Sequence, residues 1–317
     1  MIIQILLLTL GFGILIKGAD WLVDGGSALA RKYKISELAI GLTIVAFGTS
    51  MPELVVNTFA AYQKHADIVF GNIIGSNIFN LFAILGIAGL ITPLIVQSST
   101  VWKEIPISFL AVVLLFFLSN SVGSENEILS RIDGVVLLIF FGLFLYYVFL
   151  QLRGENITLE INRKEFTNIK IWLYIFMGLA FLIAGGRLVV INSVQIASSL
   201  GISQTIIGLT IVAAGTSLPE LATSVVAAMK RNNDIAVGNI IGSNIFNIFF
   251  ILGISALIRP VEYNIRFNYD LYLLGGGTIL LFIAMFSGKK KKLDRWEAGI
   301  LFVIYIGFTV LLINMEK

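Results

Sequence analysis

Long apolar runs recur along this chain, each about 18 to 25 residues in length and bounded by short polar segments. A helix of that length crosses a bilayer, and backbone in lipid must form helices or a closed barrel. Uninterrupted apolar runs favour helices. The pattern predicts an all-α membrane protein with ten transmembrane helices, at about 2–22, 37–62, 68–92, 104–119, 132–151, 171–197, 204–229, 235–258, 269–287 and 297–314.

Two adjacent spans are duplicated within the chain. Residues 41–90 align without a gap with residues 208–257, and 32 of the 50 positions are identical. The decapeptide GNIIGSNIFN, for example, begins at Gly71 and again at Gly238. The duplication predicts a protein built from two related halves.

The offset between the two copies, 167 residues, carries five predicted spans. Because five is odd, the second copy enters the membrane from the opposite side, which defines an inverted-topology repeat. We expect one integral membrane domain formed by two five-helix repeats, residues 1–160 and 161–317. In transporters of this design the substrate lies near the midplane, where broken helices from both repeats meet.

Each copy carries a proline in the middle of an apolar span. Pro52 follows a Gly-Thr-Ser segment, and Pro219 occupies the same place in the second copy. Proline lacks a backbone N–H and clashes with the carbonyl four residues earlier, so the second and seventh helices are predicted to break there. Carbonyls freed at membrane depth are tolerated only inside protein or beside a water-filled cavity.

Oxygen-bearing side chains gather around these prolines. Glu53 lies four residues after Thr49, and therefore on the same helical face. In the following span Asn72, Ser76 and Asn80 recur every four residues and form a polar stripe. Oxygen donors of this kind suit a hard cation such as Ca²⁺ or Na⁺. The equivalent groups in the second copy are Thr216, Glu220, Asn239, Ser243 and Asn247.

Two glutamates at membrane depth need a counter-charge. A lone charge there costs at least about 2.5–3.5 kcal/mol, so Glu53 and Glu220 require a cation, a proton or water. Their combined charge matches one divalent ion, or part of the charge of several monovalent ions. Structural alternatives exist: the glycines let helices pack closely, the serines bond back to their own helix, and Asn72 and Asn239 serve a helix interface.

The composition narrows the class of protein. Charged residues make up 13% of the chain, well below the roughly one quarter of a soluble domain. Cysteine is absent and His65 is the only histidine, so thiolate metal sites and zinc enzymes lack their ligands. No base accompanies a serine in the sequence, so we expect neither an enzyme nor a resident cofactor. The net charge of +3 is small and does not indicate nucleic-acid binding.

The cations in the connecting segments indicate an orientation. One set of connections holds fifteen Lys and Arg residues, and the other set, together with the C-terminus, holds six. The positive-inside rule places the first set in the cytoplasm. We therefore expect a multi-pass protein of the cell membrane with its N- and C-termini outside.

The paired GTSxPE and GSNxxN motifs resemble the α-repeats of the cation/Ca²⁺ antiporter superfamily, in particular prokaryotic sodium/calcium exchangers. The resemblance covers both repeats and the ten-span layout. It implies a secondary active antiporter that exchanges Ca²⁺ for Na⁺ by alternating access. Ions would bind between the second, third, seventh and eighth spans, while the first and sixth slide across them. Apart from the ions and lipid, it suggests no obligate protein partner.

The resemblance also implies a role for each site residue. Glu53 and Glu220 would supply carboxylates to Ca²⁺, and Thr49 and Thr216 would offer it backbone carbonyls. Flanking Na⁺ sites would use side chains or carbonyls of Ser50, Ser217, Ser76, Ser243, Ala46 and Ala213. Asn80 and Asn247 would complete the polar ring.

One departure bears on the counter-ion. Potassium-dependent members of the superfamily carry aspartate where this chain has Asn247, which argues against K⁺ transport. A Ca²⁺/H⁺ antiporter is the alternative, because a buried glutamate can take up a proton. A cation channel is a more distant alternative, since one central carboxylate pair in an inverted repeat fits alternating access better than an open pore.

Overall fold

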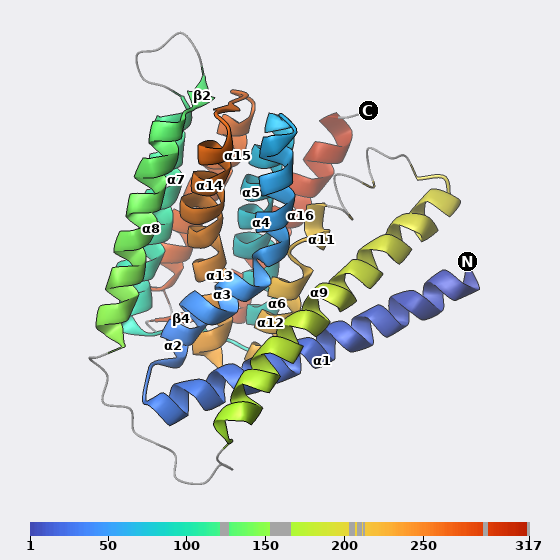
Figure 1. Cartoon of the computed structure of the whole chain (residues 1–317), viewed down its shortest axis with the longest axis vertical. Coiled ribbons are helices and arrows are strands. Elements are labelled where there is room, and N and C mark those ends of the chain that lie inside the picture. The colour runs from blue at the N-terminus through green and yellow to red at the C-terminus, as the bar shows by residue number, and fades with distance from the viewer. Residues whose placement is uncertain are drawn as a thin grey trace.

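The computed structural model describes residues 1–120, 127–152, 166–202, 207, 211, 213–287 and 291–315. Within these residues the protein is a helical bundle with two very small sheets (Figure 1). Eight of the described helices are long and apolar enough to cross a membrane, or nine when one bent pair counts as a span. The predicted span 204–229 begins outside the described residues, so the count of ten stays a prediction.

The eight long helices include several that pass through a π-helical segment, labelled η. They are α1 (Ile2–Tyr33), α5–η2–α6 (Ala66–Ile78, Phe79–Ile84, Leu85–Ile91), η3–α7 (Thr100–Glu104, Ile105–Ser119), α8 (Arg131–Gln151), α9 (Asn168–Ser199), α13–η5–α14 (Asn233–Ile245, Phe246–Leu252, Gly253–Ile258), α15 (Phe267–Ala284) and α16 (Arg295–Met315).

The two helices that carry the repeated decapeptide form the centre of the bundle. Ala66–Ile91 and Asn233–Ile258 are each 83% buried over their most apolar window, against 17% for Arg295–Asn314. A helix that is apolar all round fits such a central place, because protein rather than lipid surrounds it. The duplicated sequence therefore lies where the two halves meet.

The first proline motif lies at a bend between two helical pieces. The piece Glu37–Thr49, made of α2 (Glu37–Ile40), η1 (Gly41–Val45) and α3 (Ala46–Thr49), meets α4 (Met51–Tyr62) at an angle of 49°. Pro52 stands in the first turn of α4, where its missing N–H is harmless. The helix thus restarts just before the proline.

The second copy has the same local order. The short helix α11 (Ala213–Gly215) precedes α12 (Leu218–Met229), and Pro219 lies in the first turn of α12. Residues 208–210 and 212 lie outside the described ranges. Both glutamates consequently lie in the first turn of a helix, next to its free N–H groups.

Helices α1 and α9 form a pair that lies obliquely across the bundle (Figure 1). Each has 32 residues and is longer than the expected spans at 2–22 and 171–197. Their glycines touch: a Cβ added at Gly18 would lie 2.8 Å from the carbonyl oxygen of Gly178. Lys34, in the left-handed conformation, ends α1 with Arg31 and Lys32 in its last turn.

Two small antiparallel sheets join the halves. Strand β1 (Leu94–Ile95) pairs with β4 (Lys292–Leu293), and β2 (Ile128–Leu129) pairs with β3 (Val261–Glu262). The sequence does not predict them, because strands of two residues show no alternation. Each sheet connects a residue pair of the first half to one of the second.

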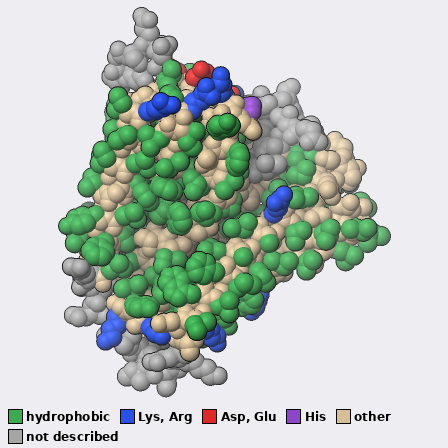
Figure 2. All heavy atoms as spheres, in the orientation of Figure 1, with side chains coloured by type: hydrophobic (Ala, Val, Ile, Leu, Met, Phe, Trp, Pro, Cys, Tyr) green, Lys and Arg blue, Asp and Glu red, His purple; other side chains and the backbone are tan. Residues whose placement is uncertain are grey.

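The outer surface is largely apolar. Figure 2 shows hydrophobic side chains over most of the visible face, with Lys and Arg mainly toward its upper and lower ends. Large side chains such as Phe59, Phe176 and Leu311 are exposed on the molecule. An apolar belt between charged ends is the surface expected of a protein surrounded by lipid.

Candidate cation-binding site

The two glutamates meet at the centre through serines from the opposite copy. Glu53 and Glu220 are 0% and 1% exposed. The hydroxyl of Ser217 donates to Oε1 of Glu53 at 2.9 Å, and the hydroxyl of Ser50 donates to Oε1 of Glu220, also at 2.9 Å. Since each serine precedes the glutamate of its own copy by three residues, the two motifs exchange partners.

The serines of the decapeptide complete this cluster. Ser76 donates to Oε1 of Glu53 at 3.5 Å, and Ser243 donates to Oε1 of Glu220 at 3.4 Å. Ser50 and Ser243 also contact each other, with 3.1 Å between their hydroxyl oxygens. Both decapeptide serines therefore bond to carboxylates, contrary to the alternative in which they bond only to their own helix.

Threonine and asparagine side chains form a second pair of reciprocal hydrogen bonds between the copies. The hydroxyl of Thr49 donates to Oδ1 of Asn239 at 3.0 Å, and that of Thr216 donates to Oδ1 of Asn72 at 3.2 Å. The amide of Asn239 in turn donates to the backbone oxygen of Glu220 at 3.3 Å. These asparagines thus join helices next to the site.

Asn80 and Asn247 are held by two asparagines that lie outside the predicted polar stripe. The Nδ2 of Asn80 donates to Oδ1 of Asn244 at 3.1 Å, and that of Asn247 donates to Oδ1 of Asn77 at 2.9 Å. Asn77 also donates to the backbone oxygen of Asn244 at 3.1 Å. Both belong to the repeated decapeptide, but they lie one position off the four-residue stripe.

Four buried oxygens at this centre have no hydrogen-bond partner. They form two matched pairs, one from the glutamates and one from the asparagines: Oε2 of Glu53, Oε2 of Glu220, Oδ1 of Asn80 and Oδ1 of Asn247. Buried polar atoms are costly when left unpaired, and a buried carboxylate more so. Carboxylate and amide oxygens are ligands of hard cations. The donor set therefore fits a cation held between the copies.

Helix ends add to the electrostatics of this centre. Glu53 and Glu220 lie in the first turns of α4 and α12, where the helix dipole and free N–H groups favour negative charge. Within the described residues no lysine or arginine forms a salt bridge with either carboxylate. The protein thus orients both carboxyl groups but pairs neither of them with a cationic side chain of the described residues.

The predicted alanine carbonyls are less open than the glutamates. The backbone oxygen of Ala46 accepts from the N–H of Ser50 at 3.0 Å, and it shares the single hydroxyl hydrogen of Thr49, whose oxygen lies 3.3 Å away, with Asn239. Ala213 begins α11. A Na⁺ ion on the Ala46 carbonyl would compete with these donors, so this part of the ligand set stays a prediction.

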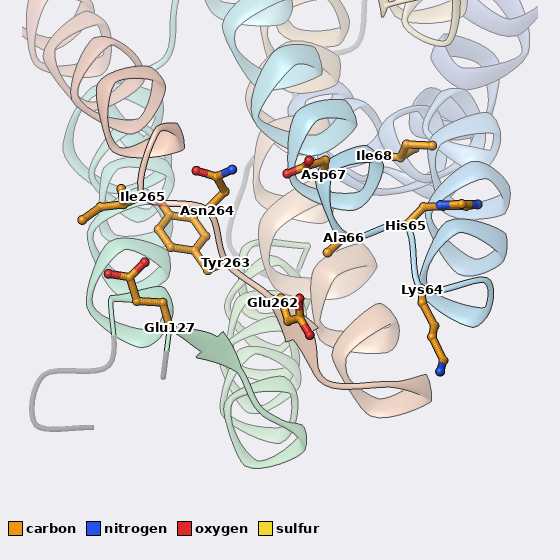
Figure 3. Close-up of a pocket in the computed structure, with 10 residues that line it drawn as sticks. All are labelled: Lys64, His65, Ala66, Asp67, Ile68, Glu127, Glu262, Tyr263, Asn264 and Ile265. Carbon is orange, nitrogen blue, oxygen red and sulfur yellow. The ribbon is translucent and has the colours of Figure 1, made fainter. Parts of the chain in front are cut away.

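The solitary histidine lies elsewhere, at a surface cavity of about 550 Å³. Figure 3 shows the His65 ring pointing away from the carboxyl groups of Glu127 and Glu262, which lie apart from each other. Burial raises the pKa of the Tyr263 phenol in this wall, and its hydroxyl donates to Oδ1 of Asn268 at 2.7 Å. Among the described residues, no group of three acidic or histidine side chains is arranged to hold a metal ion.

A buried cluster of oxygen atoms inside a helical membrane bundle is typical of cation transporters and channels. The sodium/calcium exchanger protein family matches residues 3–150 and 170–314. The chain belongs to this family, within the cation/Ca²⁺ antiporter superfamily. It is therefore a multi-pass membrane protein whose relatives are transporters, which are not enzymes.

Individual relatives match over nearly their whole length. A putative antiporter, CaxA, from Alkalimonas amylolytica is 38% identical over 99% of this chain and 100% of that protein. The sodium/calcium exchanger MaX1 from Methanosarcina acetivorans is 32% identical over 98% of each chain. A solved structure of the sodium-calcium exchanger NCX_Mj, soaked with Na⁺ and Sr²⁺, superimposes with a TM-score of 0.82, 32% identity, and coverage of 96% of this chain and 97% of that one.

Proposed function

We propose that this protein exchanges Ca²⁺ for Na⁺ across the cell membrane by alternating access, with the ions bound between Glu53 and Glu220. The observation that carries the proposal is the set of four buried, unpartnered oxygens from the two glutamates and from Asn80 and Asn247. Two carboxylates balance the charge of one Ca²⁺. The same oxygens can serve several Na⁺ ions only when Ca²⁺ is absent, which makes the two ions competitors.

The proposed division of ligands follows the chemistry of each group. Carboxylates suit the divalent ion, because Ca²⁺ binds oxygen ligands and gains most from charged ones. We assign the Thr49 and Thr216 backbone carbonyls to Ca²⁺ as well. The proposed Na⁺ ligands are Ser50, Ser217, Ser76, Ser243 and the carbonyls of Ala46 and Ala213. No cofactor beyond the transported ions is needed, so purified protein in lipid vesicles is expected to be active.

The proposed architecture is ten spans in two inverted repeats, residues 1–160 and 161–317, with the second and seventh helices broken at proline and both termini outside. Two observations support it. Matching polar groups of the two copies bond to each other reciprocally. The helix bends by 49° beside Pro52. The oblique pair α1 and α9 is the part we propose to move against the buried core.

The alternative is exchange of Ca²⁺ for protons. The unpartnered Oε2 atoms of Glu53 and Glu220 could each hold a proton instead of sharing a cation. Na⁺ is preferred because serine hydroxyls contact both carboxylates, and neutral oxygens add to the binding of a metal cation.

Vesicles containing the purified protein test the proposal. They are loaded in turn with Na⁺, K⁺ or a pH gradient, and uptake of radiolabelled Ca²⁺ is measured. We expect Ca²⁺ uptake only into Na⁺-loaded vesicles. The Glu53→Gln and Glu220→Gln variants should both lose this uptake. Glu262→Gln, which removes an exposed carboxylate, is the matched control and should transport normally. Uptake driven by the pH gradient alone would instead establish the proton alternative, and flux without any counter-ion would indicate a channel.

A further inference from the structure

A third buried carboxylate lies outside the central site. Glu104 is 0% exposed and ends the π-helical segment η3, where α7 begins. Its partners come from the far end of α8: the Tyr147 hydroxyl donates to Oε1 of Glu104, and Nε2 of Gln151 donates to the same atom at 3.1 Å. Helices α7 and α8 lie on the left side of the bundle in Figure 1, away from α4 and α12.

Three oxygens of this cluster are buried without a hydrogen-bond partner. They are Oε2 of Glu104, Oγ1 of Thr100 and Oε1 of Gln151. Thr100 is 1% exposed and lies four residues before Glu104, so both side chains leave the helix on the same side. Oε1 of Glu104 therefore accepts two hydrogen bonds. Oε2 accepts none and is buried in the same cluster as the two unpaired neutral oxygens of Thr100 and Gln151.

No basic side chain in the described part of the chain is paired with Glu104. Lys103 contacts the cluster through Tyr147, with its Nζ 5.3 Å from the centre of the tyrosine ring. A buried carboxylate with two donors on one oxygen and none on the other is costly unless a further partner is bound.

The helix geometry resembles that of the central site. Segments η2 and η5 carry Asn80 and Asn247, so π-helical turns already accompany ligand groups in this protein. Segment η3 carries both Thr100 and Glu104. Such turns widen a helix and are frequent at functional sites.

We propose that Glu104, Thr100 and Gln151 form a second cation site, occupied by Na⁺, which joins the start of α7 to the end of α8. One carboxylate balances one monovalent ion, whereas Ca²⁺ would leave an unbalanced positive charge in a buried place. The three unpaired groups are all oxygens, as a hard cation requires. This site does not depend on the proposed exchange, because none of its groups belongs to the central cluster.

The test uses the full-length protein carrying Glu53→Gln and Glu220→Gln, so that the central carboxylates are neutral in every arm. The thermal unfolding midpoint is measured with increasing NaCl and, separately, with equal concentrations of choline chloride. We expect NaCl to raise the midpoint above the choline curve, because a ligand that binds only the folded state stabilises it. Adding Glu104→Gln should abolish the difference, and adding Glu262→Gln should leave it unchanged.

A second variant covers the case in which Glu104→Gln fails to fold. Thr100→Val keeps the shape of the side chain and removes its hydroxyl, so it should raise the NaCl concentration at half-effect by about tenfold. The proposal is overturned if NaCl and choline chloride act alike in the parent protein. It is equally overturned if the Na⁺ effect survives Glu104→Gln, or if Thr100→Val leaves the half-effect concentration unchanged.

Discussion

At the scale of single residues, the central feature is that each glutamate depends on a serine from the other copy. A hydrogen bond to a charged group contributes about 1.5–3 kcal/mol, more than one between neutral groups. Ser50 and Ser217 make such bonds at 2.9 Å to Glu220 and Glu53. They orient one carboxylate oxygen and leave the other free for an ion.

Ser50→Ala tests this role. Loss of the hydroxyl removes a donor to Glu220 and a proposed Na⁺ ligand, so the apparent Na⁺ affinity in Ca²⁺ uptake should fall by about tenfold to a hundredfold. The apparent Ca²⁺ affinity should change less, because the carboxylates remain. The matched control is Ser255→Ala, a buried serine whose hydroxyl donates to the carbonyl of Ile251 at 2.8 Å. Equal losses for both ions in Ser50→Ala would contradict the assigned role.

Asn77→Ala tests a residue that emerged only from the structure. The variant removes the acceptor of the Asn247 amide and a donor to the Asn244 carbonyl. We expect a loss of about 1–3 kcal/mol in stability together with weaker Ca²⁺ affinity, because the asparagine oxygens lose their orientation. Thermal unfolding and vesicle uptake provide the two readouts. Asn120→Ala, which breaks a bond to Asn268 at 3.0 Å, should lower stability without changing Ca²⁺ affinity.

At the scale of helices, α1 and α9 pack as one unit because glycines bring their backbones together. The contact involves Gly18 and Gly178, and also Gly185, where an added Cβ would lie 2.6 Å from the backbone nitrogen of Leu15. Small residues permit such approach in membrane helices, where van der Waals packing drives association. A pair this tight is suited to move as a single body.

Gly18→Ala should separate the two helices. The new Cβ would lie 2.7 Å from the backbone nitrogen of Leu182, which backbone movement alone can relieve, at a typical cost of about 1–3 kcal/mol. The thermal unfolding midpoint and the transport rate should both fall. Gly13→Ala on the same helix meets nothing within 4 Å and is the control, with stability equal to or above that of the parent protein. Equal behaviour of the two variants would argue against the close packing.

At the scale of the whole molecule, the site belongs to neither half alone. The hydrogen bonds around both carboxylates cross between the halves, and two small sheets connect the halves as well. One half would bury a glutamate without its serine partner. The complete set of ligands therefore exists only when both copies are assembled.

Much of this arrangement was predictable from the sequence. The two motifs place Glu53 and Glu220 at equivalent positions of the repeats. Because a charged group inside an apolar span needs a partner, the duplication predicts that the two carboxyl groups lie close together. Asn77 and Asn244 could not be identified in the same way, because they lie off the helical stripe and act across the interface between copies. Helix α1 continues past the expected end at residue 22, and Asp24 in this extension contacts Lys230 of the second half at 2.7 Å.

The exchanged serine–glutamate bonds also explain why the duplicated segments have stayed so alike. A substitution in one motif alters the surroundings of the carboxylate in the other, so neither copy can drift on its own. Selection would then act on the two segments as if they were one sequence written twice. The peripheral helices do not take part in these reciprocal serine–glutamate bonds and can diverge more freely.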